Sequence, residues 1–214
     1  MERNLIRKEK NLLEVQKGKE IKEFLKEHVC EKLRQGEVVP PEDIMKMRFV
    51  VTWNKNEDGT KKGKARLVVL GFQDPHLGTE QTSAPTLTNR SKQLLLQVVV
   101  QNDWKLKKGD VTAAFLQGRP LQNCKYALAP QKLADAMDLP PGERDIRLLK
   151  SVYGLTTAPL EWYAQVDKVL QELGGVQAAA DPCVWTFNSR NGEHIRIIGA
   201  HIDDFLIARS EIPE

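Results

Sequence analysis

The sequence of 214 residues contains few cysteines, few aromatic side chains and no long apolar run. Its three cysteines, Cys30, Cys124 and Cys183, are odd in number and far apart, which argues against a disulfide framework and against a paired-cysteine zinc site. No run approaches the roughly 18 apolar residues of a membrane span, and the charged N-terminus lacks the apolar segment of a signal peptide. We therefore expect a cytoplasmic or nuclear protein that is neither secreted nor held in a membrane.

The sequence also lacks a large excess of one charge, because its net charge is only +3. The basic residues are nevertheless unevenly distributed. Residues 1–35 contain ten Lys or Arg against seven Glu, and residues 46–66 contain seven Lys or Arg against two acidic residues. The second cluster is able to contact phosphate groups, but a solvated hairpin face explains it equally well. Charge alone therefore identifies no nucleic-acid binder.

The composition, 41% hydrophobic and 29% charged, is that of a globular chain with one large domain or two small ones. Apolar spacing and turn residues predict its elements. They are a helix over 2–35, closed by Gly36 and interrupted by Gly18; strands over 48–54 and 64–72 around a turn at 56–59; a buried helix over 89–102; a strand ending at 110; a loop-rich stretch over 118–141; a short strand over 145–149; a helix over 158–173; and strands over 184–187 and 194–201 around a turn at 191–192.

Two adjacent carboxylates, Asp203 and Asp204, lie between apolar runs at 195–200 and 206–208. Because neighbouring Asp residues disfavour strand interiors, this pattern predicts a hairpin with the acids at its tip. A solvated acidic turn without a ligand would give the same pattern. A third carboxylate, Asp110, follows another β-like segment, and hard oxygen ligands on two strand ends suit Mg²⁺ in a two-metal site.

A second metal hypothesis concerns Cys183, His194 and His201, which are able in principle to share an ion. Their spacing is loose, and at such spacing a buried cysteine and hydrogen-bonded histidines are the more common explanation. We treat these three residues as structural.

Five segments occur in order over about residues 48 to 209. They are Lys64–Phe72 (KARLVVLGF), Ala84–Thr86 (APT), Gly109–Gly118 (GDVTAAFLQG), Ser151–Tyr163 (SVYGLTTAPLEWY) and His201–Asp204 (HIDD). Together they resemble the copia-type retrotransposon reverse transcriptases, in which the last three are similar to polymerase motifs A, B and C, with His201 in place of the usual Tyr. Five ordered segments are far more specific than any one of them.

The resemblance implies an α+β fold of the right-hand polymerase type. Its palm would be a ferredoxin-like antiparallel sheet with helices on one face, and its fingers would be the basic hairpin. The implied domains are a helical N-terminal extension over 1–46 and a fingers and palm domain over 47–214. The family's later palm strand, primer grip, thumb and ribonuclease H are absent from this chain, so the resemblance implies weak primer-template binding and little activity by these residues alone.

The resemblance also assigns residues to roles. Asp110 and Asp203 would be the bridging ligands of two Mg²⁺ ions, with Mn²⁺ as an alternative, Asp204 would be a weaker ligand, and the Val111 carbonyl would be a further donor. Phe115 would select deoxynucleotides by clashing with a 2′-hydroxyl, although without the surrounding motif a core role would be favoured. The remaining nucleotide-binding residues would be Lys64, Arg66, Tyr153 and Gly154. Trp162 and Tyr163 are expected in the core.

The implied function is RNA-directed DNA polymerisation, with a primer-template and deoxynucleoside triphosphates as partners. If the chain is a fragment, the remaining polyprotein domains, namely the thumb, ribonuclease H and integrase, are further partners. A catalytically inactive remnant or domesticated nucleic-acid-binding module is the alternative, because the acids are intact while the thumb is missing. A metal-dependent nuclease is weaker, since no motif places a general base.

Overall fold

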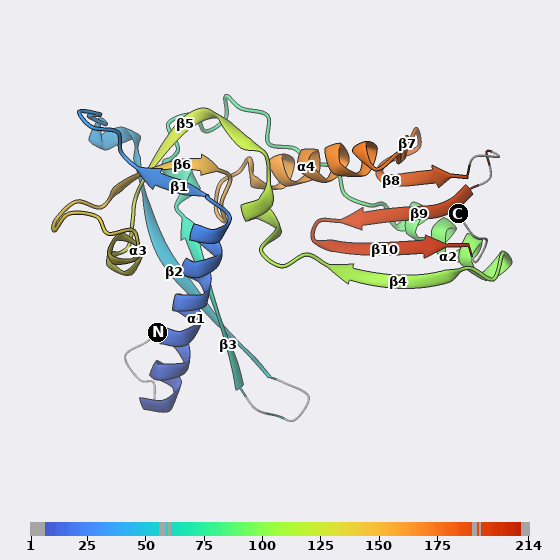
Figure 1. The fold of residues 1–214 in the computed structure, drawn as a ribbon, viewed down its shortest axis with the longest axis horizontal. Helices are drawn as coiled ribbons and strands as arrows, with labels where there is room; N and C mark the ends of the chain where they lie inside the picture. The colour runs from blue at the N-terminus through green and yellow to red at the C-terminus, as the bar shows by residue number, and fades with distance from the viewer. Residues whose placement is uncertain (1–6, 56–58, 60, 190–191, 193, 211–214) are drawn as a thin grey trace. The chain divides into compact units, whose positions relative to one another are not determined.

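The computed structural model describes residues 7–55, 59, 61–189, 192 and 194–210 (Figure 1). It confirms a mixed α+β fold with two sheets. The predicted turns at 56–59 and 191–192 fall mostly outside the described residues. In the part of the chain that is described, no helix is both long and apolar enough to cross a membrane.

The described chain forms helices and strands that are interspersed up to α4 and are followed by strands alone. The helices are α1 (Arg7–Lys26), α2 (Asn89–Gln101), α3 (Gln131–Ala136) and α4 (Ala158–Glu172). The strands are β1 (Cys30–Lys32), β2 (Ile44–Lys55), β3 (Lys61–Val69), β4 (Lys105–Asp110), β5 (Pro120–Leu128), β6 (Asp145–Lys150), β7 (Val176–Ala178), β8 (Asp181–Asn188), β9 (His194–His201) and β10 (Asp204–Arg209). Short 3₁₀ turns cover Pro41–Asp43, Gly71–Gln73 and Ala114–Gln117.

The chain divides into two compact units, each with its own five-stranded sheet. The first unit comprises residues 1–81 and 115–158, and its sheet has the order β1-β6-β5-β2-β3. The second comprises residues 82–114 and 159–214, and its sheet has the order β4-β10-β9-β8-β7 with antiparallel neighbours throughout. The predicted segment over 1–46 therefore belongs to the first unit, together with the β2–β3 hairpin.

The N-terminal helix is shorter than the prediction of 2–35, which was wrong beyond Lys26. The helix ends because His28 takes a left-handed conformation (φ 50°), while the amides of His28 and Val29 donate to the carbonyls of Leu25 and Phe24. The segment that follows forms β1, which pairs with β6. The helix passes through Gly18 without a break, so the predicted interruption there was wrong.

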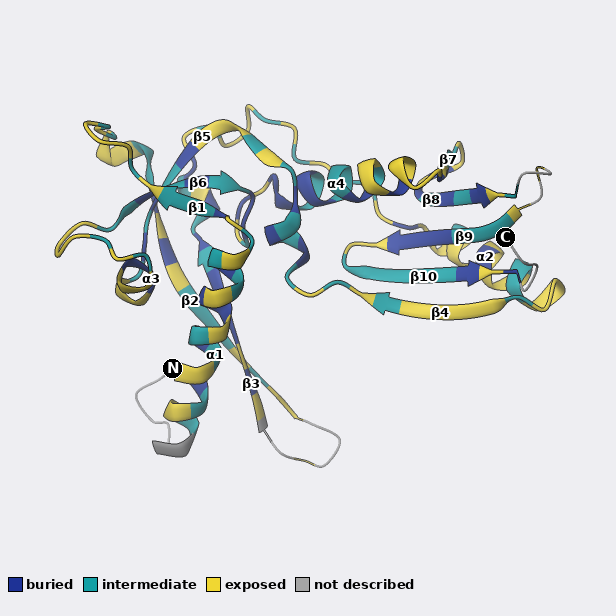
Figure 2. Cartoon of the chain, in the orientation of Figure 1, coloured by how far each residue is buried: buried dark blue, intermediate teal, exposed yellow. Residues whose placement is uncertain are grey.

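Helix α1 packs on β3 and contributes a buried carboxylate to it. The Glu20 side chain is only 7% exposed, and its Oε1 accepts a hydrogen bond from the Leu67 amide at 3.1 Å. Burial raises the pKa of this carboxyl. Phe24 and Ile21 are buried on the same helix. Figure 2 shows buried and exposed positions following one another along α1. The basic hairpin is thus supported by a helix that precedes it in the sequence.

The stretch over 118–141, predicted as loop-rich, contains β5 and α3 instead. Strand β5 runs parallel to β2 and antiparallel to β6. Its alternation was hidden because a lysine occupies an inward position. The Lys125 ammonium, 1% exposed, donates to Asp74 Oδ2 at 2.7 Å and to Glu80 Oε2 at 2.9 Å. This buried ion triad attaches the loop after β3 to β5.

In the second unit, helices contact both faces of the sheet, so the expectation of helices on one face was wrong. A Cβ added at Gly199 of β9 would meet Leu87 and Leu95, and Leu95 belongs to α2. Trp185 of β8 points to the other face, where its indole donates to Asp167 of α4 at 3.0 Å. The absent side chain at Gly199 leaves the room that α2 occupies.

Helix α2 itself was expected to be buried, and this too was wrong. Of its residues only Leu95 is buried, while Leu94 and Val100 are 56% and 80% exposed. Leu95 lies over Gly199, Val98 and Val99 are half-buried, and Leu96 is exposed together with Leu94 and Val100. Thr88 caps its N-terminus by accepting from the Ser91 amide, and the buried Asp181 of β8 accepts from the Thr88 amide at 3.0 Å.

We expect Lys125→Met to lower the free energy of unfolding by about 3–5 kcal/mol, because it leaves the buried Asp74 carboxylate without its cation. Urea denaturation would measure the change. Lys132→Met is the matched control, since the Lys132 ion pair with Glu14 is half exposed and its removal should cost about 1 kcal/mol or less. Equal losses in the two variants would contradict the role of the triad.

Candidate active site

The acidic turn between β9 and β10 is confirmed as a hairpin tip. His201 pairs with Asp204, so the loop contains only Ile202 and Asp203. Ile202 takes a positive φ of 59° and Asp203 does not, which is the pattern of a type II′ turn. Such turns favour Gly at the first position, and a β-branched residue with positive φ is an outlier. Backbone outliers of this kind concentrate at functional sites.

The third predicted carboxylate lies directly beside this tip. Strand β4 runs antiparallel to β10 with Asp110 opposite Asp204, and the Val111 amide donates to the Asp203 carbonyl at 3.0 Å. Cross-strand partners share one face of a sheet, so Asp110 and Asp204 point to the same side. Like charges directly opposite each other destabilise a sheet. The arrangement therefore favours a functional explanation over a structural one.

A lysine partly offsets this repulsion. Lys108 lies two residues before Asp110 on the same face of β4, and its Nζ is 3.0 Å from Asp204 Oδ1. The hydrogen bond to Asp204 raises the pKa of the Lys108 ammonium, and the charges of Asp110 and Asp203 add to this effect. A cavity of about 270 Å³ is lined by four ionisable residues, Asp204, Lys108, His201 and Lys92, and by five neutral ones, Leu87, Asn89, Gly199, Phe205 and Leu206. Two lysines thus line the same cavity as Asp204.

The carboxylates at this edge fit Mg²⁺ in their chemistry, but they do not form a preassembled cage. Among the described residues, no group of three or more His, Cys, Asp or Glu is close enough to hold a metal ion. Asp204 is engaged by Lys108, which leaves Asp110 and Asp203 as the carboxylates best suited to an ion. Mg²⁺ commonly uses one or two carboxylates and completes its shell with water and substrate phosphates. Asp110, at the end of β4, and Asp203, in the adjacent turn, supply two such carboxylates.

The predicted nucleotide-binding residues form a separate cluster in the first unit. The Arg66 guanidinium lies over the Tyr153 ring at 4.6 Å from its centroid, and the rings of Tyr153 and Phe115 are tilted with centroids 5.5 Å apart. Phe115 is half-buried, and its role in sugar selection stays a prediction. Lys64 is exposed two positions before Arg66 on β3, hence on the same strand face. We call Lys64, Arg66, Phe115, Tyr153 and Gly154 the aromatic–arginine cluster.

Gly154 has a structural reason to be glycine that the sequence did not reveal. Its φ is +97°, and an added Cβ would lie 2.0 Å from the Val69 carbonyl oxygen. An added Cβ at Gly71 would in turn lie 2.0 Å from the Gly154 carbonyl oxygen. The Val69 amide also donates to the Tyr153 carbonyl at 2.9 Å. Two glycines thus let the end of β3 pack directly on the Tyr153 turn; nucleotide binding by Gly154 stays a prediction.

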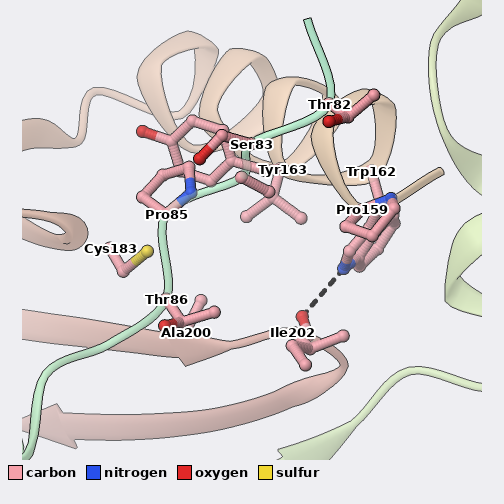
Figure 3. Close-up of a pocket in the computed structure, with 12 residues that line it drawn as sticks. Thr82, Ser83, Pro85, Thr86, Pro159, Trp162, Tyr163, Cys183, Ala200 and Ile202 are labelled. Carbon is pink, nitrogen blue, oxygen red and sulfur yellow. Dashed lines mark hydrogen bonds between the residues drawn. The ribbon is translucent and has the colours of Figure 1, made fainter. Parts of the chain in front are cut away.

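An uncharged cavity of about 360 Å³ lies on the α4 side of the second unit's sheet (Figure 3). It is lined by Thr82, Ser83, Ala84, Pro85, Thr86, Pro159, Trp162, Tyr163, Val166, Cys183, Ala200 and Ile202. Trp162 is buried as expected, and its indole Nε1 donates to the Ile202 carbonyl at 2.8 Å. Burial raises the pKa of the Cys183 thiol to about 12, which keeps it protonated.

Sequence reasoning missed two side chains at the acidic tip, Lys108 and Trp162. A signal for Lys108 existed, because a lysine two residues before Asp110 on a strand must share its face. No comparable signal existed for Trp162, since its contact with Ile202 joins a helix to a turn that is distant in the sequence. The tertiary fold alone brings these two residues together.

Comparisons with known proteins agree over most of the chain. A family model described as "Reverse transcriptase (RNA-dependent DNA polymerase)" matches residues 39–214. The retrovirus-related Pol polyproteins from transposons RE2 and RE1 of Arabidopsis thaliana are each 32% identical over 181 residues, or 82% of this chain. The corresponding polyprotein from transposon TNT 1-94 of Nicotiana tabacum is 29% identical over 167 residues, or 76% of this chain. The chain spans 12% of the length of each of these relatives.

We expect Lys108→Met to tighten Mn²⁺ binding at the acidic tip about fivefold, because it removes a nearby positive charge and releases the Asp204 carboxylate. Electron paramagnetic resonance of free Mn²⁺ would measure the dissociation constant. Lys107→Met is the matched control, since Lys107 is the exposed neighbour on the opposite face of β4 and should change the constant little. Unchanged or weaker binding by Lys108→Met would refute this account of the site.

Proposed function

Because the chain belongs to the reverse transcriptase family, as the reverse transcriptase domain of a copia-type Pol polyprotein, we propose that it catalyses RNA-directed addition of deoxynucleotides to a primer 3′-hydroxyl. The observation that carries the proposal is the pairing of Asp110 with Asp204 beside the Ile202-Asp203 turn, which places the three acids in the backbone at the same end of one sheet. In this proposal the second unit's sheet is the palm, and the β2–β3 hairpin belongs to the fingers.

The acidic tip has the task of holding the reacting phosphates and the primer end. Asp110 and Asp203 would hold the metal ions, Val111 would add its carbonyl oxygen, and Asp204 would contribute less because Lys108 engages it. Two Mg²⁺ ions, or Mn²⁺ in their place, would neutralise developing charge and lower the pKa of the 3′-hydroxyl. The hydrogen bond from the Val111 amide to the Asp203 carbonyl holds the end of β4 against the turn, so the backbone segments that carry the two carboxylates are fixed relative to each other.

The aromatic–arginine cluster has the task of binding the incoming nucleotide. Arg66 offers a planar fork for triphosphate oxygens, and its stacking on Tyr153 holds that fork in one orientation. Lys64 supplies a second cation on the same strand face. Phe115, whose ring is held against Tyr153, is the proposed barrier to a ribose 2′-hydroxyl. Gly154 keeps the backbone beside Tyr153 free of a side chain.

A second candidate function is nucleic-acid binding without catalysis. It is favoured by one observation, the ion pair that occupies Asp204 while no three-carboxylate cluster is assembled in the described chain. In that case the basic residues of the hairpin would hold a primer-template by phosphate contacts, and the acids would have no chemical role. Replacing one of the acids should therefore abolish primer extension if the chain is catalytic, and should have no such effect if the chain only binds nucleic acid.

We expect Asp110→Asn or Asp203→Asn to reduce primer extension on an RNA template more than ~10³-fold, because each removes a metal ligand that acts on the transition state. Asp204→Asn should cost less. Extension assays with Mg²⁺ would measure the rates, and circular dichroism should be unchanged. If primer extension is too slow to measure, the Mn²⁺ dissociation constants of the same variants would test whether these residues bind the metal. Full activity in either of the first two variants would reject the catalytic assignment and leave the binding function.

Sugar selection gives an independent test. We expect Phe115→Val to raise ribonucleotide incorporation relative to deoxyribonucleotide incorporation, because a smaller side chain leaves room for the 2′-hydroxyl. Competition between the two nucleotides in one extension reaction would measure the ratio. Phe72→Val, at a residue 71% exposed in the same unit, is the control. A lower unfolding free energy with an unchanged ratio would show that Phe115 is only a packing residue.

A further inference from the structure

The backbone of the acidic turn is held in an unfavourable conformation. Ile202 occupies the position of a type II′ turn that favours glycine, with a φ of 59° and a branched Cβ. A β-branched residue reaches this region only when its surroundings impose it. Asp203 is the next residue, so the orientation of Ile202 also sets the direction of the Asp203 carboxylate. Something outside the turn must therefore stabilise it.

Two hydrogen bonds from other elements anchor the turn. The Trp162 indole of α4 donates to the Ile202 carbonyl at 2.8 Å, and the Val111 amide donates to the Asp203 carbonyl at 3.0 Å. Consecutive peptide groups are thus fixed, one by a side chain and one by the neighbouring strand. Trp162 is only 6% exposed, and indole has a single N–H and no acceptor, so this bond has one geometry. Figure 3 shows it crossing the end of the uncharged cavity.

We propose that Trp162 is a positioning residue for the metal-binding acids: its indole N–H holds the Ile202-Asp203 turn in its left-handed conformation and thereby orients Asp203. The inference rests on the proposed function for its consequence in catalysis, but the restraint on the turn is a property of the chain alone. Losing one neutral hydrogen bond costs up to a tenfold change in an equilibrium constant. The effect should appear at the turn rather than throughout the sheet.

Trp185 provides a matched comparison in the same unit. It is also buried, and its indole also donates to an α4 residue, Asp167, at 3.0 Å. Its bond does not involve the turn. If Trp162 acts only by packing, its replacement should have the same effects as the replacement of Trp185. If Trp162 is a positioning residue, only its replacement should change metal binding and amide exchange at the acidic turn.

The experiment compares Trp162→Phe with Trp185→Phe in the apo chain and with Mn²⁺. Trp162→Phe should weaken Mn²⁺ binding about five- to tenfold and speed amide hydrogen exchange at Asp204 and Phe205, while Trp185→Phe should do neither. Because Phe leaves a smaller ring, a second variant places the benzothiophene analogue of tryptophan at 162, where sulfur replaces the N–H and the shape is kept. It should reproduce both changes with little loss of thermal stability.

A second arm tests the strain directly. Ile202→Gly removes the need for a restraint, so adding Trp162→Phe to that background should change turn exchange far less than it does in the parent chain. Equal exchange and equal Mn²⁺ binding in the parent and the benzothiophene variant would overturn the positioning role. A parent chain that neither binds Mn²⁺ nor extends a primer would refute the proposed function. In that case faster amide exchange at the turn of the benzothiophene variant would still support the restraint by Trp162.

Discussion

The register of β10 between β4 and β9 is the constraint on which the acidic end of the second unit depends. It places Asp110 opposite Asp204 and leaves a loop of two residues, Ile202 and Asp203. A slip of one residue would turn Asp110 to the other face of the sheet and would remove the bond between Val111 and Asp203. Two further contacts depend on this register. Gly199 must face Leu95 of α2, and the Ile202 carbonyl must face the Trp162 indole of α4.

The first unit depends on backbone contacts and a buried ion triad rather than on apolar packing alone. Gly71 and Gly154 allow the end of β3 to meet the Tyr153 turn, which carries the ring that Arg66 and Phe115 contact. Lys125 attaches the loop after β3 to β5 through Asp74 and Glu80. The glycine contacts and the ion triad both restrain the chain around β3, the strand that carries the lysine and arginine proposed to bind the nucleotide. They fix the backbone next to these two residues without covering their side chains.

Two local rules are broken where the proposed chemistry occurs. Carboxylates face each other across β4 and β10, and a branched residue takes the place of glycine beside them. Both features cost stability, and neither improves the packing of the unit. Lys108 offsets the first and Trp162 the second. A structural turn would have no need of such compensation, which is the physical argument that this end of the sheet serves a function.

The sequence by itself determined the elements with strong local patterns and the identity of the acids. The hairpin of β2 and β3, the strand ending at Asp110, helix α4 and the Asp-Asp hairpin were predicted, because alternation, helical periodicity and turn chemistry are local. Strand β5, the end of α1, the exposure of α2 and the placement of helices on both faces were not. Each depends on a partner distant in the sequence: on Asp74 and Glu80 for Lys125, on β6 for β1, and on the space at Gly199 for α2. Tertiary structure likewise decided that Trp162 contacts the acidic turn, since its indole reaches the Ile202 carbonyl only when α4 packs against the sheet.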